Sequence, residues 1–190
     1  MGYEEFIKTQ NKINKTQVIW SQVNDYPDKF KTSVERKARI IFYEDLYNQL
    51  PSDVKQEIES PEELKETLKM YFKCENISYN FIKSYKDFVI KKFENGYLWN
   101  KITSEKKYNE LFKEVEIIDK DIEHKSIGIN YPKMFEAVKD AYPKYITTKK
   151  EMKTILNTYF EKNNMNVEYI KDEDEYLNYT ENVVKRVLNK

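Results

Sequence analysis

The sequence is poor in the residues from which most catalytic and cofactor sites are built. It contains three glycines, one cysteine and one histidine among 190 residues. Three scattered glycines cannot form the glycine-rich loops that hold nucleotide phosphates. A single cysteine, Cys74, excludes a disulfide within this sequence, and with His124 alone it cannot supply the ligands of an ordinary zinc site. We therefore expect neither a cofactor nor a bound metal ion.

The residues that could take part in catalysis do not form a recognisable set. Cys74 lies between two segments predicted to be helical and His124 lies among charges, so a catalytic cysteine–histidine pair is not expected. Acidic residues alternate over 119–123 as in a calcium loop, but the sixth and twelfth positions hold His124 and Asn130 instead of Gly and Glu. A carboxylate pair stays open, because nothing selects one among 33 acidic residues. The sequence favours a protein that is not an enzyme.

Long apolar runs and an excess of either charge are also missing. The formal net charge is +0, from 33 basic and 33 acidic residues, and the only arginines are Arg36, Arg39 and Arg186. This balance argues against a surface that grips nucleic acid or anionic lipid everywhere. No run approaches the length of a membrane span, and lysines interrupt the first 20 residues where a signal peptide would be apolar. We expect a cytoplasmic protein with no membrane partner.

The composition that remains favours a mainly α fold. Few glycines disfavour the many tight turns of β-rich folds. Aromatic residues make up 15% of the chain, with 16 tyrosines and 10 phenylalanines, so large rings can fill a core although hydrophobic residues are only 39% of the chain. We expect a multi-helix bundle.

The axis of this bundle is predicted at about residues 77–94. On a helical wheel, the apolar residues of this segment share one arc, Lys83, Lys86 and Lys91 lie opposite, and only Lys92 falls within the arc. The apolar residues are Ile77, Phe81, Ile82, Tyr85, Phe88, Val89 and Phe93. Asn95 and Gly96 follow, and this pair tolerates the left-handed backbone that ends many helices.

Capping patterns predict where other helices begin. Thr32 and Glu35 form a capping box before a helix expected over 33–50. Ser60 followed by Pro61 predicts a second start, and Thr148 with Glu151 predicts a third. A further helix is expected from Thr103 or Ser104 to about Val115.

The C-terminal part of the sequence predicts a helix-turn-helix unit. We expect a helical bundle over 1–124 and a helical subdomain over 125–190, which either folds alone or packs with the bundle. Residues 167–169 and 176–179 have a two-residue period and could pair as a small β-hairpin. Helix, turn, helix and hairpin in this order are typical of a winged-helix unit.

These observations favour a binding protein that acts through protein–protein contacts. The absence of catalytic motifs and the surplus of tyrosine fit a small inhibitor or adaptor of the kind that phages or mobile elements encode. Tyr97, Trp99 and Tyr145 are predicted interface residues, because they lie in connecting segments and combine apolar area with a polar tip.

The alternative is a nucleic-acid-binding module that uses the C-terminal helix-turn-helix. Lys149, Lys150 and Lys153 lie at the start of the second helix, where they could meet phosphates or base edges. The acidic residues over 172–175, at the tip of the expected hairpin, would repel a nucleic-acid backbone.

Overall fold

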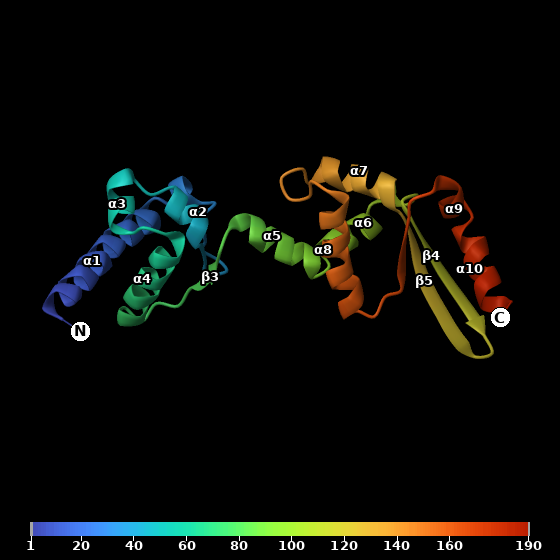
Figure 1. Ribbon diagram of the computed structural model, residues 1–190, viewed down its shortest axis with the longest axis horizontal. Coiled ribbons are helices and arrows are strands. Elements are labelled where there is room, and N and C mark those ends of the chain that lie inside the picture. Colours follow the sequence, from blue (N-terminus) through green and yellow to red (C-terminus); the bar gives the residue numbers. More distant parts are fainter. Residues whose placement is uncertain (1, 190) are drawn as a thin grey trace. The chain divides into compact units, whose positions relative to one another are not determined.

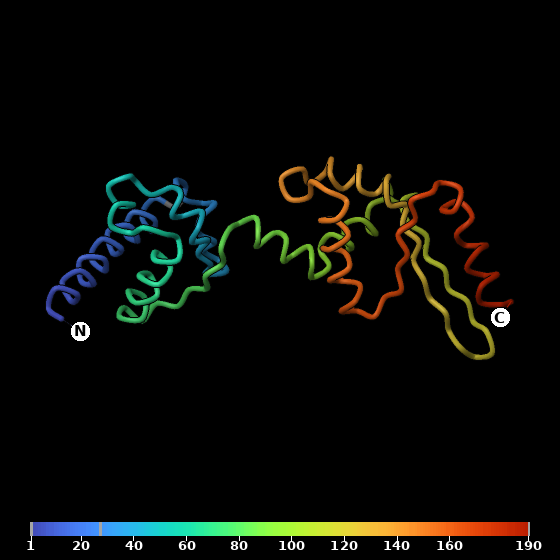
Figure 2. Tube along the Cα trace, in the orientation of Figure 1, coloured from blue at the N-terminus to red at the C-terminus, as the bar shows by residue number. Residues whose placement is uncertain are grey.

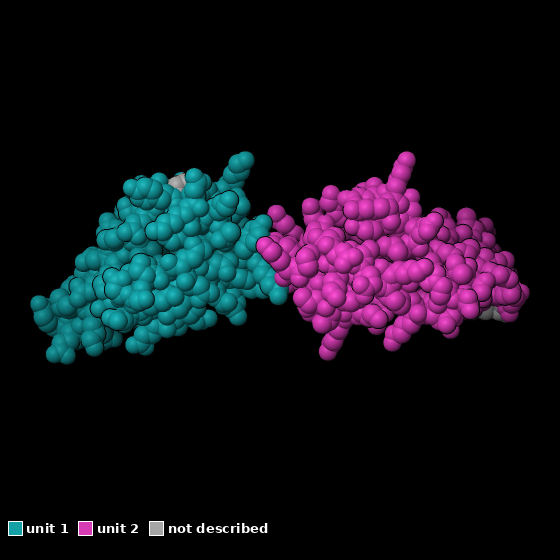
Figure 3. Space-filling model, turned by 90° about the horizontal axis from the view of Figure 1, so that it is seen from above, with its two compact units in different colours: residues 1–88 teal, residues 89–190 magenta. Residues whose placement is uncertain are grey.

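The computed structural model describes residues 2–189, apart from the side chain of Pro27, as two compact units (Figures 1 and 3). The units comprise residues 1–88 and residues 89–190. Each contains a three-stranded sheet among its helices, so the fold is mixed α/β, and the expectation of an all-α bundle is wrong. The domain boundary expected after residue 124 falls inside a strand of the second unit, Ile122–Asn130.

The first unit combines a long helix, several short helices and a small sheet. Its sheet has the order β1-β2-β3, with β1 antiparallel and β3 parallel to the central β2. Its elements are α1 (Tyr3–Asp25), η1 (Pro27–Phe30), β1 (Val34–Glu35), β2 (Ile40–Phe42), α2 (Tyr43–Asn48), α3 (Ser52–Glu57), α4 (Pro61–Cys74) and β3 (Asn80–Ile82). The last helix to begin in it, α5 (Tyr85–Glu94), continues into the second unit.

Aromatic packing between α1 and the segment around α4 forms the core of the first unit. The ring of Trp20 lies edge-on to Phe72, with ring centroids 4.9 Å apart, and edge-on to Tyr79 at 5.0 Å. Such T-shaped arrangements suit the ring quadrupole and bury large apolar area. Trp20 is therefore fixed in the interior, with 8% of its surface exposed.

Two of the predicted helices of this unit are partly strands. The segment 33–50 forms β1, β2 and only then α2, because Ile40, Ile41 and Phe42 are all buried in the centre of the sheet. The central helix predicted over 77–94 begins only at Tyr85, since residues 80–82 pair with β2 as a parallel strand. All three strands are short, and β3 cannot be recognised locally because its partner β2 lies some 40 residues earlier in the chain.

The second unit is a sheet with helices on both faces. Its strands have the order β4-β5-β6; β4 and β5 form an antiparallel hairpin, and β6 is parallel to β5. Between this hairpin and β6 the chain forms α7 and α8, and Figure 2 shows its path. The elements are α6 (Tyr97–Ser104), η2 (Lys106–Tyr108), β4 (Phe112–Asp119), β5 (Ile122–Asn130), α7 (Tyr131–Ala141), α8 (Lys149–Lys162), β6 (Val167–Ile170), α9 (Glu173–Leu177) and α10 (Tyr179–Leu188).

Alternate residues of the strands pack against different helices. Ile127 and Ile129 point toward the core formed with α6, α7 and α8. Val115 and Ile170 lie on the other face, in a smaller cluster with Tyr176 and other residues of α9 and α10. Since neighbouring residues of a strand face opposite sides of the sheet, this unit covers both sides of its sheet with helices.

The helix starts predicted in both units are confirmed where a local cap determines them. Ser60 accepts a hydrogen bond from Glu63 N at 3.1 Å, and Thr148 accepts one from Glu151 N at 3.1 Å. Gly96 follows α5 with φ = 109°, the left-handed conformation predicted there. The ring of Tyr159 also approaches this glycine so closely that a Cβ would be 2.6 Å from it.

The winged-helix expectation is wrong in its strands, although α7 and α8 follow one another as predicted. Residues 167–170 form a strand, but Tyr176–Tyr179 is helical instead of forming the second strand of a hairpin. Asp172 caps α9 by accepting a hydrogen bond from Glu175 N at 2.9 Å. The hairpin of this unit is instead β4–β5, and the segment predicted as a helix from Thr103 or Ser104 to about Val115 contains η2 and the start of β4.

Candidate functional site

The three aromatic residues predicted at an interface lie in different environments. Tyr97 exposes 50% of its surface and stacks on Phe93, with ring planes 12° apart. Tyr145 is half-buried and lies edge-on to the same ring at 6.1 Å. Trp99 is only 4% exposed and packs against Phe160 at 4.9 Å. Trp99 is thus a core residue of the second unit, whereas Tyr97 offers a ring to solvent.

The three lysines predicted to bind nucleic acid all lie exposed on the first two turns of α8. The backbone carbonyl of Lys149 accepts a hydrogen bond from the Tyr131 hydroxyl at 2.8 Å, which ties α8 to α7. Lys153 is different, since its Nζ lies 5.1 Å from the centre of the Tyr169 ring, within cation–π range. The structure therefore brings Lys153 to β6, while Lys150 stays on the outer surface.

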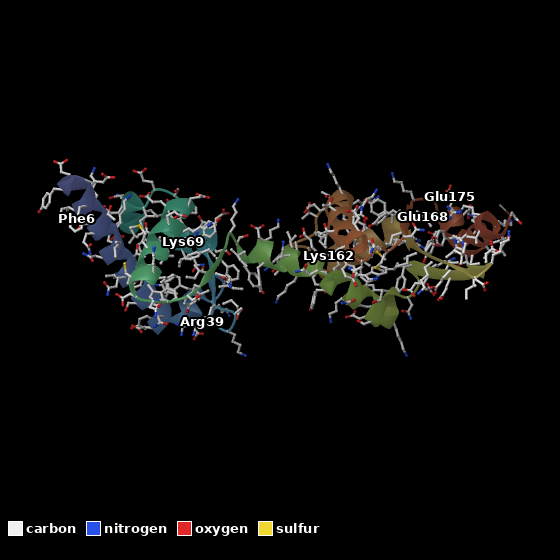
Figure 4. The ribbon with its side chains drawn as sticks, turned by 90° about the horizontal axis from the view of Figure 1, so that it is seen from below. Phe6, Arg39, Lys69, Lys162, Glu168 and Glu175 are labelled. Carbon is white, nitrogen blue, oxygen red and sulfur yellow. The ribbon has the colours of Figure 1, made fainter. Side chains whose placement is uncertain are left out.

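A groove of about 670 Å³ runs along β6 in the second unit. Its floor is the segment from Met165 to Ile170. Its walls are formed by Lys153, Asn157, Phe160 and Glu161 of α8 and by Glu175 of α9. Two of the lining residues, Glu168 and Glu175, are labelled in Figure 4. Two helices that cover opposite faces of the sheet thus frame the edge of its last strand.

The outer edge of β6 carries unpaired backbone groups. Ile127 N donates to the Asn166 carbonyl at 2.9 Å. This hydrogen bond shows which backbone groups of the parallel strand β6 point toward β5. Along a strand, the N–H and C=O of successive residues point to alternate sides in the plane of the sheet. Val167 and Tyr169 therefore direct their backbone groups away from β5, and nothing in the described part of the chain bonds to them.

The side chain of Tyr169 is fixed where the groove meets α8. Its hydroxyl donates to Asn157 Oδ1 at 2.8 Å, and its ring lies edge-on to Tyr131 at 5.3 Å. Burial raises the pKa of the Tyr169 hydroxyl, and the nearby charge of Glu161 adds to this shift. The hydroxyl is therefore neutral at ordinary pH and acts as a hydrogen-bond donor that holds α8 against β6.

The charge in the groove is mainly negative. Glu168 forms a two-pronged ion pair with Arg186, at 2.9 and 3.2 Å. Glu161 and Glu175 are exposed and form no ion pair with any residue between 2 and 189. Lys153 is the one basic side chain among the lining residues, and it lies over a ring. Two carboxylates are thus available to a cationic ligand.

The side chains that could bind a metal ion are dispersed in the described part of the chain. Within residues 2–189, no group of three or more His, Cys, Asp or Glu side chains could hold a metal. Cys74 is exposed at the end of α4. His124 lies in β5 opposite Ile117, at the rim of another shallow pocket.

The chain was compared with protein-family models, curated proteins and solved structures, and no match was found. None of the helices in the described residues is both long and apolar enough to cross a membrane.

The sequence indicated part of this groove. The period-two pattern of 167–169 predicts the strand that forms the floor, and Lys153 is among the lysines predicted to bind nucleic acid. The sequence does not point to Glu161 and Glu175, because no local pattern relates two residues on separate helices to a common strand edge. The only local sign is the four-residue spacing of Lys153, Asn157 and Glu161, which places all three on one face of α8.

Proposed function

We propose that this chain is a non-catalytic binding protein that acts through contacts with another protein, as small inhibitors and adaptors do. The observation that carries the proposal is the free backbone edge of β6 at the bottom of an open groove. Exposed strand edges are templates for pairing with another chain, and folded proteins commonly protect them.

The two edges of this sheet differ in their protection. On β4, the opposite edge, Lys113, Glu114 and Glu116 place three charged side chains along the strand, and charges on an edge strand discourage pairing. On β6 the single charged residue, Glu168, is already paired with Arg186. The edge of β6 is thus less protected against pairing with another strand than the edge of β4, which supports a role in recognition.

We place this role in the cytoplasm. The sequence has one cysteine and so gains nothing from an oxidising compartment. A recognition surface built on backbone groups and carboxylates also works without a cofactor.

The experiment is affinity capture with the whole chain from extracts of the cells that encode it, at near-physiological salt. Val167→Pro removes the outward N–H of the edge while leaving the pairing with β5 in place, because proline is tolerated on the outer side of edge strands. Val167→Ala is the matched control, since it loses side-chain packing but keeps the N–H.

We expect the wild-type chain and Val167→Ala to retain the same protein and Val167→Pro to lose it. Retention of no protein by the wild-type chain would show that the proposed function is wrong. Equal retention by all three chains would keep a protein-binding function but move it away from β6.

A second candidate function is nucleic-acid binding by the start of α8. The observation that favours it is the exposure of Lys149 and Lys150, neither of which forms an ion pair with a residue in the described range. This candidate predicts salt-dependent binding that Lys149→Glu and Lys150→Glu weaken. A flat gel-shift titration at low salt, with duplex and single-stranded probes, would remove it.

A further inference from the structure

We infer that the groove of the second unit binds an extended peptide carrying lysine or arginine, which joins the sheet as a fourth strand beside β6. This inference rests on the protein-binding function proposed above and specifies the chemistry of the partner segment.

The backbone of β6 provides the first contact. Val167 and Tyr169 each direct one N–H donor and one C=O acceptor into the groove. A neighbouring strand forms its hydrogen bonds with every second residue, and this is the spacing of Val167 and Tyr169. An extended peptide satisfies these four groups together, whereas a helix has its own backbone groups paired internally and cannot.

The walls of the groove suit the side chains of such a strand. Side chains of an added strand would point alternately toward α8 and toward α9, because these helices cover opposite faces of the sheet. Glu161 lies on the α8 wall and Glu175 on the α9 wall. Each face of the peptide would therefore meet one carboxylate.

The charge of the groove selects a basic peptide. Glu161 and Glu175 form no ion pair within residues 2–189, while Glu168 is neutralised by Arg186 and Lys153 is held over the Tyr169 ring. The charge left for a ligand is negative. The same charge opposes a second copy of this chain, since pairing two β6 edges would bring two acidic grooves together, and it opposes nucleic acid.

The positions of the carboxylates also predict a spacing. Residues separated by an odd number of positions in a strand point to opposite faces. A peptide with two lysines at odd spacing can reach both Glu161 and Glu175, whereas one with two lysines at even spacing reaches only one wall. Composition and net charge are the same in the two peptides.

The experiment uses the full ¹⁵N-labelled chain, with backbone amide signals followed by NMR as peptide is added. The first probe is a threonine-rich peptide with two lysines at odd spacing. The second has the same composition with the lysines at even spacing. The third is the first probe with N-methyl groups on every second backbone amide, so that the peptide has no N–H donors on the edge that would face β6.

We expect the first probe to shift the amide signals of Val167 and Tyr169 and to slow their hydrogen exchange. The second should bind several-fold more weakly, and the N-methylated probe should not bind. Glu161→Lys combined with Glu175→Lys should weaken the first probe about tenfold, because two surface ion pairs are lost and replaced by repulsion. Glu114→Lys with Glu116→Lys is the matched control on the other edge of the sheet.

Three results would overturn the inference. The first is that the amide signals of Val167 and Tyr169 do not change with the first probe, and the second is that the N-methylated probe binds equally well. The third is that raised protein concentration alone protects these amides, which would identify a second copy as the occupant. If the whole chain captures a partner while no peptide binds, the inference fails and the proposed function stands. If neither occurs, both fail.

Discussion

The ring of Tyr179 lies directly on Gly128, so closely that a Cβ atom at residue 128 would be 2.5 Å from Tyr179 Cδ1. The hydroxyl of the same tyrosine donates to Ser126 Oγ at 2.8 Å, two residues away on β5. The contact of α10 with the sheet therefore depends on a strand position that has no side chain.

Gly128→Ala should destabilise the second unit. The added methyl group must displace a buried aromatic ring, and overpacking of this kind costs about 1–3 kcal/mol. The measurement is the free energy of unfolding from denaturant titration. Gly2→Ala is the control, because nothing lies within 4 Å of the Cβ it would add. Equal stability of the two variants would contradict the packing described for Tyr179.

The two units should unfold as separate transitions. Each contains one buried tryptophan, Trp20 in the first unit and Trp99 in the second, and their hydrophobic clusters share no residue. In a Trp20→Phe chain, fluorescence reports only the second unit, and in a Trp99→Phe chain it reports only the first. Gly128→Ala should shift the transition seen through Trp99 and leave that seen through Trp20 unchanged. A shift of both would show that the units unfold together.

The second unit should lose stability at high pH. Burial raises the pKa of Tyr176 from its ordinary 10.0 to about 12, and its hydroxyl donates to the Glu110 carbonyl at 2.7 Å. Because the folded-state pKa is raised, this contribution is complete below pH 10.0 and is lost as pH rises toward about 12. Unfolding followed by tyrosinate absorbance should show this loss, and Tyr176→Phe should reduce it. An identical pH profile in Tyr176→Phe would contradict the assignment.

The first unit should lose stability at low pH through the contact between α1 and α4. The hydrogen bond from the Lys12 ammonium holds the pKa of the Glu63 carboxyl below its ordinary 4.5, and the hydrogen bond from Glu59 N–H lowers this pKa further. A lowered folded-state pKa means that this stability is present above pH 4.5 and lost as pH falls through the folded value. In Lys12→Met, unfolding monitored through Trp20 should depend less steeply on pH in the acid range. Lys8→Met, which removes a lysine of the same helix outside this contact, is the control.

The cap of α8 should contribute measurably to the stability of the second unit. Thr148 accepts a hydrogen bond from Glu151 N, so Thr148→Ala leaves a helix N–H without its partner. Loss of such a cap costs about 1 kcal/mol, while Thr148→Ser keeps the hydroxyl and should be nearly neutral. Thermal unfolding of the two variants provides the comparison, and equal melting temperatures would show that the cap adds nothing.

Local chemistry was predictable from the sequence, and the pairing of strands was not. Ser60 and Thr148 cap helices through atoms three residues away, so a short stretch of sequence contains the whole interaction. The helix expected over 77–94 failed because residues 80–82 pair with β2, some 40 positions earlier. Ser84, which caps the start of α5 by accepting from Asp87 N at 3.1 Å, was the local sign of the later start.

The candidate groove was predictable only in part for the same reason. The strand over 167–169 was indicated by its period, but its partner is β5 instead of the segment 176–179. The edge that faces the groove exists because β6 is last in the order β4-β5-β6, and no residue type encodes that order locally. Trp99 is predicted as an interface residue because its partner Phe160 is distant in the sequence, whereas in the structure its ring packs beside Phe160 in the core.

The strand order of the second unit also determines when its parts can form. The β4–β5 hairpin joins neighbouring segments through the two-residue turn at Lys120 and Asp121, both with positive φ, and can close as soon as it is synthesised. β6 must wait until residues 131–166 have been made and have crossed over the sheet. Contacts of this range slow folding and leave apolar edges exposed in the meantime. The edge of β5 that later pairs with β6 is therefore open to contacts with other chains until β6 has formed.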